Sequence, residues 1–229
     1  MKTRNALKLN FQFDAQRIRK ELESISDSFY PILSAQIEDE ALEGMHLIAP
    51  DREGKVDERG HTFHMSEELK KCPYLQEILD TFQCDKFLYR TQNLKPGGKI
   101  EMHRDRGRGI VDGIVRLNIP VSTNDQVYFY IDGERIAMKD GECWLPEVTK
   151  LHEVENRSDE LRMQIMIDCD LNDWWKDVLK EHGMIKEPAK YGRYSLRELQ
   201  AMKDSFVSMK MDRKMIEELE FEIVARAEV

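Results

Sequence analysis

The chain has 229 residues, of which 41% are hydrophobic and 8% aromatic, so it contains enough apolar material to bury a core and is not a disordered chain. It carries 35 basic and 44 acidic side chains, and the net charge of −9 argues against a nucleic-acid partner or an anionic membrane surface. This length favours one domain, which we expect to span residues 1–229.

The four cysteines, Cys72, Cys84, Cys143 and Cys169, form no CxxC pair. The first residues lack the apolar run of a signal peptide, and no apolar stretch approaches the length of a membrane span. We therefore expect a cytoplasmic protein whose cysteines are reduced and serve as small core residues.

Residues 1–85 show one strand pattern and several helix patterns. Polar and apolar residues alternate over 7–13, which predicts a half-buried strand. Asp14 is suited to cap an amphipathic helix, Ser66 indicates a second helix start, and Pro73 breaks that helix or opens another. Residues 34–65 have little periodicity, and we expect long loops with short pieces of strand there.

Residues 86–170 have a different character, because short runs of branched and aromatic residues alternate with turn signals such as Asp132-Gly133. The strands predicted on this basis are 87–94, 99–103, 114–121, 126–131, 134–138, 142–145, 151–156 and 161–170. Eight short strands without intervening helices predict a mainly β fold, a cupin-like jelly roll made of two sheets. This segment is the expected catalytic core.

Residues 171–229 return to helical patterns and form a predicted C-terminal extension. Ser195-Leu-Arg-Glu198 matches a capping box and opens an amphipathic, methionine-rich helix. Such a helix is typical of a core element or of a dimer interface, so a homodimer formed through these helices is one expectation. A helical lid over the mouth of the jelly roll is the other.

His103, Asp105 and His152 are the candidate metal ligands. His103 and Asp105 are two residues apart near a predicted strand end, a spacing that places side chains on one face of a strand. His152 adds a second imidazole, and two histidines with one carboxylate leave open positions on a metal, as in non-haem Fe(II) oxygenases. Arg162, on the next predicted strand, supplies a planar fork suited to a carboxylate.

Four motifs occur in order at fitting distances: Leu94-Lys-Pro-Gly-Gly-Lys-Ile-Glu-Met-His-Arg-Asp105, Val115-Arg-Leu-Asn-Ile-Pro-Val121, Gly141-Glu-Cys-Trp-Leu145 and His152-Glu-Val-Glu-Asn-Arg-Ser-Asp-Glu-Leu-Arg162. Together they resemble the aspartyl/asparaginyl β-hydroxylase family, which includes bacterial hydroxylases of free amino acids such as proline cis-4-hydroxylase. The resemblance covers residues 86–170 and implies a double-stranded β-helix with Fe(II)- and 2-oxoglutarate-dependent dioxygenase activity.

The resemblance also implies residue roles. His103, Asp105 and His152 would bind Fe(II), and Arg162 would bind the distal carboxylate of 2-oxoglutarate, with dioxygen as the second co-substrate. Arg116 matches an arginine that helps to hold the co-substrate. Many relatives have a histidine where this chain has Asn118, which can donate a hydrogen bond but carries no charge.

Each of these residues also has a structural alternative. Arg162 could form an ion pair with Asp168 or Glu160, and Arg116 could be a structural arginine within a strand. The arginine-rich loop 104–109 either recruits an anionic group or is simply solvated.

The substrate that the resemblance implies is a free amino acid or an amino-acid-derived small molecule, an option favoured because the C-terminal helices could cap the mouth of the jelly roll. The alternatives are the Asp, Asn or other side chain of a peptide, a cupin-like metal-binding sensor without oxygenase activity, and another metal reaction such as isomerisation.

Overall fold

The computed structural model describes residues 4–33, 36–37, 41–51, 62–184, 194, 196–209, 211, 213, 215–217, 219–220 and 223. The chain divides into two compact units, Met1–Lys176 and Asp177–Val229. The first unit contains both β-sheets and all the candidate site residues, and the second is helical where it is described.

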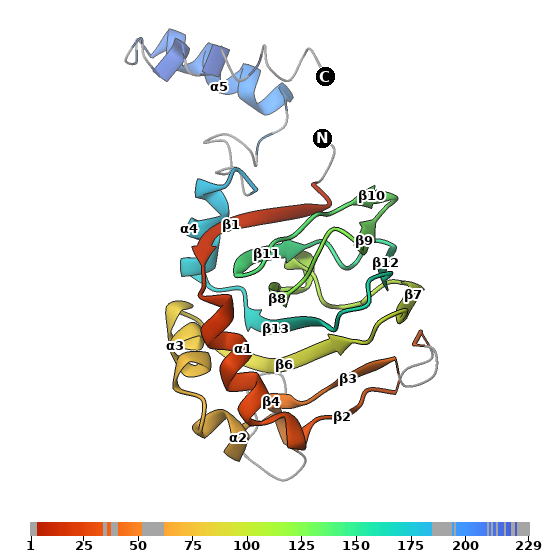
Figure 1. Ribbon diagram of the computed structural model, residues 1–229. Helices are drawn as coiled ribbons and strands as arrows, with labels where there is room; N and C mark the ends of the chain where they lie inside the picture. The colour runs from red at the N-terminus through yellow and green to blue at the C-terminus, as the bar shows by residue number, and fades with distance from the viewer. Residues whose placement is uncertain are drawn as a thin grey trace. The chain divides into compact units, whose positions relative to one another are not determined.

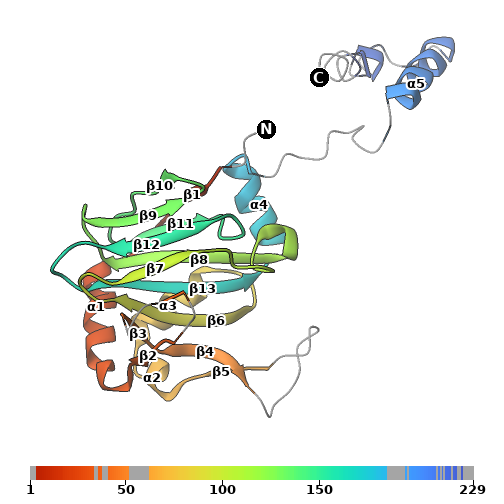
Figure 2. The same cartoon turned by 90° about the vertical axis from the view of Figure 1, so that its right-hand side faces the viewer.

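Two antiparallel sheets form the framework of the first unit (Figure 1). The larger sheet has the order β1-β11-β8-β13-β6-β3-β2, with β4 joined to β6 and β5 joined to β4; part of this order runs from top to bottom in Figure 2. The smaller sheet has the order β10-β9-β12-β7. The expected mainly β jelly roll is confirmed.

The eight strands predicted between residues 86 and 170 are all present. They are β6 (Lys86–Leu94), β7 (Lys99–His103), β8 (Ile114–Ser122), β9 (Val127–Ile131), β10 (Glu134–Arg135), β11 (Glu142–Pro146), β12 (His152–Asn156) and β13 (Arg162–Asp170). Only β10 is clearly shorter than expected. The sequence pattern predicts these strands well because most of them are central and bury one face or both.

The N-terminal elements pack around the larger sheet. β1 (Ala6–Gln12) is the predicted first strand and pairs with β11. Asp14 caps α1 (Ala15–Ser24) by accepting from two backbone amides, and Ser66 caps α2 (Glu67–Lys70) by accepting from one. Pro73 opens a separate helix, α3 (Pro73–Thr81), and these helices gather beside β6 and β13 in Figure 1.

Residues 34–65 contain short pieces of strand, as expected, and these continue the larger sheet. β2 (Tyr30–Pro31), β3 (Leu42–Gly44), β4 (His46–Asp51) and β5 (Thr62–Met65) extend the larger sheet beyond β6. Short strands at the edge of a sheet leave little periodicity, because packing against β6 fixes them instead of an alternating pattern of their own.

The C-terminal elements are α4 (Asp173–Glu181), which begins in the first unit, and α5 (Leu196–Ser208). Asn172 accepts a hydrogen bond from the backbone amide of Trp175 at the start of α4. Buried Leu199 and Leu219 form a small apolar cluster in the second unit. Ser195 of the expected capping box lies outside the described residues, among which no helix is long and apolar enough to cross a membrane.

Candidate active site

The three predicted metal ligands lie together at one end of the smaller sheet. Potential ligand atoms of His103, Asp105 and His152 are all within 4.8 Å of one another. The two histidines are opposite each other on β7 and β12, with ring centroids 4.2 Å apart, and Nε2 of His103 is 3.5 Å from Oδ1 of Asp105. The fold thus brings together residues that are 49 positions apart in the sequence.

An irregularity in the pairing of β7 with β12 turns the side chain of His103 toward the cavity between the two sheets. The register shifts between the pairs His152–His103 and Val154–Ile100, so that two residues of β7 lie opposite one residue of β12 between these pairs. In a regular strand Ile100 and His103 would point to opposite faces, whereas both line the same cavity here.

Asp105 reaches the site differently from the prediction. We expected His103 and Asp105 to lie on one face of the same strand. β7 ends at His103, so Asp105 lies in the loop that follows the strand. Its backbone amide donates to the carbonyl of Val148 at 2.9 Å, and this hydrogen bond holds the loop against the segment before β12.

Both imidazoles are oriented so that Nε2 is available as a ligand. Nδ1 of His103 is 2.7 Å from the carbonyl of Glu101, and Nδ1 of His152 is 3.0 Å from the carbonyl of Lys150. These contacts fix the proton on Nδ1 and leave Nε2 with its lone pair, as metal-binding histidines require. Burial lowers the pKa of His152, which favours the neutral form that binds a metal.

The larger sheet forms the facing wall of the cavity with polar side chains. Alternate residues of its central strands point into the cavity, while the residues between them are buried on the opposite face of the sheet. The cavity-facing residues of these strands are Arg90 and Gln92 on β6, Arg116 and Asn118 on β8, and Arg162, Gln164 and Met166 on β13. Such a density of polar groups inside a sandwich is typical of a binding site.

Arg116 is held by two carboxylates of the protein. Its Nε and Nη2 donate to the fully buried Asp168, each at 2.7 Å, and its Nη1 donates to Asp105. Burial opposes the charged form, but the two carboxylates outweigh it and raise the pKa of Arg116. Arg116 therefore links the candidate metal ligand Asp105 to the core of the larger sheet.

Arg162 faces the histidines from the other sheet and has no carboxylate partner among the described residues. Its guanidinium donates to the side chain of Gln164, and the alternative ion pairs with Asp168 and Glu160 are not formed. Arg162 is 5% exposed, and burial lowers its pKa to about 10. A buried cation of this kind is stabilised by an anionic ligand.

Two further polar groups in the cavity lack partners. Oδ1 of Asn118 and Nε of Arg90 are buried and make no hydrogen bond with any described residue. Arg90 belongs to none of the sequence motifs described above. In the alternation of β6, Phe87 and Tyr89 point to the apolar face of the sheet, and Arg90 therefore points to the cavity side.

The cavity has a volume of about 260 Å³ and contains the candidate metal ligands at one side and Arg162 at the other. Ile100, Phe129 and Val154 of the smaller sheet supply apolar walls. Sites for drug-sized ligands occupy about 300–1,000 Å³, so the cavity suits small molecules.

The comparisons with known proteins agree with this geometry. A family model described as aspartyl/asparaginyl beta-hydroxylase matches residues 12–171, whereas none of the curated protein sequences matches the chain. A 2OG-Fe(II) oxygenase-family oxidoreductase from Burkholderia pseudomallei is similar in structure, with a TM-score of 0.51, 14% identity, and coverage of 74% of this chain and 86% of its own. The carbocyclase SnoK from nogalamycin biosynthesis has a TM-score of 0.50, 10% identity, and coverage of 73% and 80%.

Proposed function

The chain belongs to the aspartyl/asparaginyl β-hydroxylase family, and we propose that this Fe(II)- and 2-oxoglutarate-dependent dioxygenase hydroxylates an unactivated C–H bond of a free amino acid or an amino-acid-derived molecule. In this reaction 2-oxoglutarate, dioxygen and the substrate C–H bond give succinate, CO2 and a C–OH group. The substrate class is the new part of the proposal.

The observation that carries the proposal is the pairing of two features across one cavity. A His-Asp-His cluster lies on one wall, and the buried guanidinium of Arg162, without a carboxylate partner in the described structure, lies on the other. A metal and a carboxylate-binding cation on opposite walls suit a keto acid that is bound at both of its ends.

His103, Asp105 and His152 would hold the Fe(II). Two neutral imidazoles and one carboxylate match the donor preference of this ion, and the three residues leave further positions for small ligands. When bound, Fe(II) supplies the dioxygen activation that couples decarboxylation of the keto acid to hydroxylation. The contacts of Nδ1 in both histidines keep the ligand nitrogens aimed at a common point.

The three other predicted site residues would act on the co-substrate side. Arg162 would bind the distal carboxylate of 2-oxoglutarate, and Asn118 would donate a hydrogen bond from its amide nitrogen. The co-substrate role of Arg116 stays a prediction, while its contacts with Asp168 and Asp105 support a positioning role for the metal ligand.

The test is a screen of the purified protein with Fe(II), 2-oxoglutarate and each standard free amino acid, in which succinate release is measured. We expect one or a few amino acids to stimulate succinate release and to gain one oxygen atom, detected by mass spectrometry. A blank amino-acid screen together with stimulation by Asp- or Asn-containing peptides would contradict the substrate class. Metal binding without succinate release from any mixture would instead favour the sensor alternative.

A further inference from the structure

The cavity contains more positive charge than its own carboxylates neutralise. Three arginines line it, Arg90, Arg116 and Arg162, and the nearby carboxylates are Asp105 and Asp168. Both carboxylates contact Arg116, so neither of the other two guanidiniums has an anionic hydrogen-bond partner in the described structure. One of these two cations, Arg162, is accounted for by the distal carboxylate of the co-substrate.

Arg90 is the cation that the proposed function leaves unexplained. In the cross-strand register its neighbours are Met166 on β13 and His46 on β4, and neither is an acid. Its Nη2 is 3.6 Å from the sulfur of Met166, a weak acceptor, and its Nε has no partner among the described residues. Burial, together with repulsion from Arg116, lowers the pKa of Arg90 to about 10, which leaves it charged at neutral pH.

Asp168 lies near enough to favour the charged form of Arg90, but no hydrogen bond joins the two in the described structure. Its Oδ1 accepts from Arg116, and its Oδ2 accepts from Arg116 and, at 3.3 Å, from Arg108 of the loop after β7. Asp168 thus already accepts hydrogen bonds from two arginines. An anion in direct contact with Arg90 would therefore have to come from a ligand.

Arg90 and Arg162 occupy different cross-strand rows of the polar wall. Arg90 lies opposite Met166, and Arg162 lies four residues from Met166 along β13, a distance of roughly 13–14 Å between the Cα atoms of Met166 and Arg162 at the usual rise of a strand. Arg90 shares its cross-strand row with Met166 and Asn118, and Asn118 is two residues from Arg116, whose guanidinium contacts the candidate metal ligand Asp105, so Arg90 lies closer than Arg162 to the metal end of the wall. The two cations without a carboxylate partner thus lie at different positions along the wall.

We propose that Arg90 binds the α-carboxylate of the substrate, so that the enzyme takes free amino acids and not residues within a peptide. The inference rests on the proposed function and adds the group that recognises the substrate. A guanidinium binds a carboxylate through two parallel hydrogen bonds, which fixes the orientation of a small acid as well as its position. The volume of about 260 Å³ suits a small acid beside 2-oxoglutarate.

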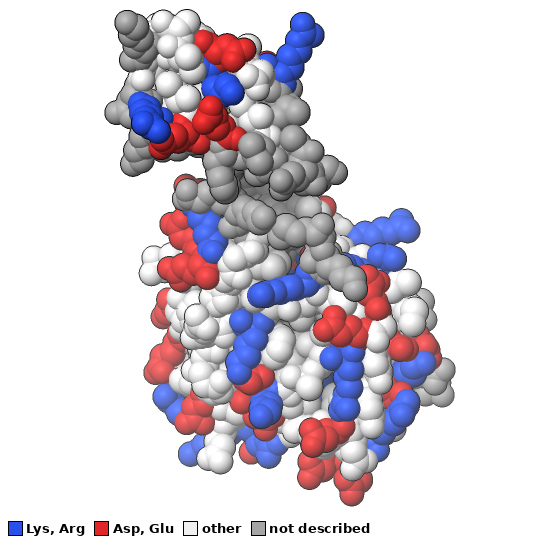
Figure 3. Space-filling view, turned by 90° about the horizontal axis from the view of Figure 1, so that it is seen from above, with Lys and Arg blue, Asp and Glu red and all other residues white. Residues whose placement is uncertain are grey.

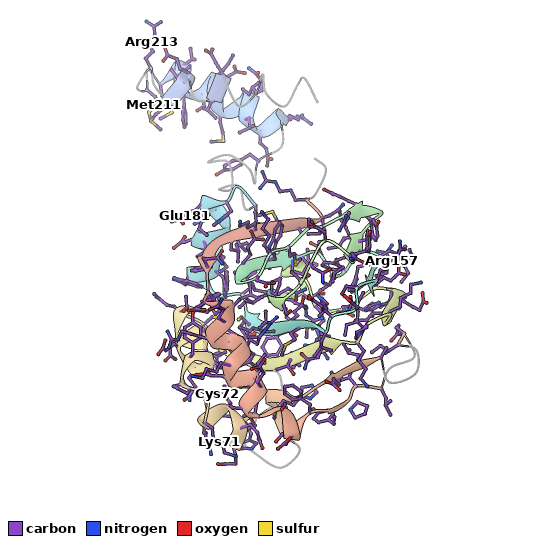
Figure 4. All side chains as sticks on the ribbon, in the orientation of Figure 1. Lys71, Cys72, Arg157, Glu181, Met211 and Arg213 are labelled. Carbon is purple, nitrogen blue, oxygen red and sulfur yellow. The ribbon has the colours of Figure 1, made fainter. Side chains whose placement is uncertain are left out.

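The test compares the wild type with Arg90→Met, a variant that keeps the bulk of the side chain and removes its charge. Binding of each free amino acid is measured by calorimetry under anaerobic conditions, with Fe(II) and saturating 2-oxoglutarate. The amide of each amino acid that binds is measured as well, since it lacks the carboxylate. Arg90→Lys retains a charge, and Arg157→Met makes the same change at an exposed position just after β12 (Figure 4).

We expect Arg90→Met to weaken amino-acid binding by about 10- to 100-fold, in the range of a lost charge-assisted hydrogen bond. The amide should bind the wild type as weakly as the acid binds the variant. The affinity for 2-oxoglutarate should stay within about twofold, because Arg162 is unchanged. Arg90→Lys should retain part of the affinity, and Arg157→Met all of it.

Three results would overturn the inference. The first is wild-type amino-acid affinity in Arg90→Met, and the second is a loss of 2-oxoglutarate binding in that variant, which would make Arg90 the co-substrate clamp. The third is a wild type that binds 2-oxoglutarate and a peptide but no free amino acid. The dioxygenase chemistry survives each of these results, whereas failure of the wild type to bind Fe(II) and 2-oxoglutarate would refute the proposed function itself.

Discussion

The buried guanidinium of Arg162 is expected to lower the stability of the ligand-free protein and to favour binding of an anionic ligand. Its guanidinium is 5% exposed and has only the amide of Gln164 as a hydrogen-bond partner in the described structure. A buried charge without a counter-ion destabilises the folded state, and it persists where a ligand supplies the missing anion. The free protein should therefore be less stable than a version with an apolar side chain at this position.

The variant Arg162→Met tests both the loss of stability and the binding of 2-oxoglutarate that we assign to Arg162. We expect the free protein to gain about 1–3 kcal/mol of unfolding free energy, because an uncompensated buried charge is replaced by an apolar side chain of similar length. Stabilisation by 2-oxoglutarate in the presence of a metal should disappear. Thermal unfolding of wild type and variant, with and without 2-oxoglutarate, measures both effects, and a variant that keeps the wild-type stabilisation by 2-oxoglutarate would contradict the role of Arg162.

The sequence predicts which residues share the cavity better than it predicts their hydrogen-bond partners. His103, Asp105, His152 and Arg162 were found from motif order, and the structure brings all four to one cavity. Which arginine meets Asp168 depends on the cross-strand register, which pairs Asp168 with Arg116 and leaves Arg162 six residues further along β13. This register cannot be predicted from a local sequence pattern, because it depends on the pairing of two strands that are far apart in the chain.

At the scale of elements, the site depends on the pairing of particular strands. The irregular pairing of β7 with β12 turns His103 inward, and the regular pairing of β13 with β6 and β8 aligns the polar wall. The strands were predictable from alternation, but the irregularity was not, since it appears only when β7 is paired with its partner. The same limit explains why the positions of β3 to β5 within residues 34–65 were not predicted, although short strands were expected there.

The attachment of β1 to β11 gives a prediction about pH. Glu142 on β11 is buried, which would raise its pKa, but hydrogen bonds from Lys8 on β1 (2.5 Å), the amide of Lys139 (2.9 Å) and the indole of Trp144 (2.8 Å) outweigh burial and lower it. A lowered carboxyl pKa stabilises the fold above the ordinary value of 4.5, and this contribution is lost as the pH falls through the folded-state pKa.

Glu142→Gln should accordingly reduce the unfolding free energy by about 1.5–3 kcal/mol at neutral pH, the range for hydrogen bonds to a charged group. The difference from the wild type should shrink at pH ~3, where the carboxyl group is protonated. Denaturant unfolding at the two pH values measures it. Glu77→Gln, at an exposed ion pair with Arg17, should change stability by less than about 0.5 kcal/mol, and equal effects of both variants would contradict the account.

At the scale of the whole molecule, the net charge of −9 and the positive cavity are compatible because they occupy different places. On the face of the first unit seen in Figure 3, acidic and basic side chains are intermingled, and neither sign forms a continuous patch. The arginines of the cavity are buried or partly buried, so they offer no extended surface for nucleic acid.

Composition and periodicity predicted the jelly roll and its helical flanks, and they left the functions of those flanks open. The division into Met1–Lys176 and Asp177–Val229 places the whole candidate site in the first unit. The expected dimer through the C-terminal helices, and the alternative of a lid, stay predictions. Oligomeric state depends on surfaces that meet only in an assembly, and a single sequence does not specify them.

The central claim is that His103, Asp105 and His152 support Fe(II)-dependent consumption of 2-oxoglutarate. The most direct test measures succinate formation by the wild type, His103→Ala and His152→Ala, with Fe(II), 2-oxoglutarate and dioxygen, beside His64→Ala at an exposed position on β5 as the control. We predict that the wild type and the control form succinate only when Fe(II) is present and that both site variants form none. Succinate formation at the wild-type rate in either site variant would contradict the claim.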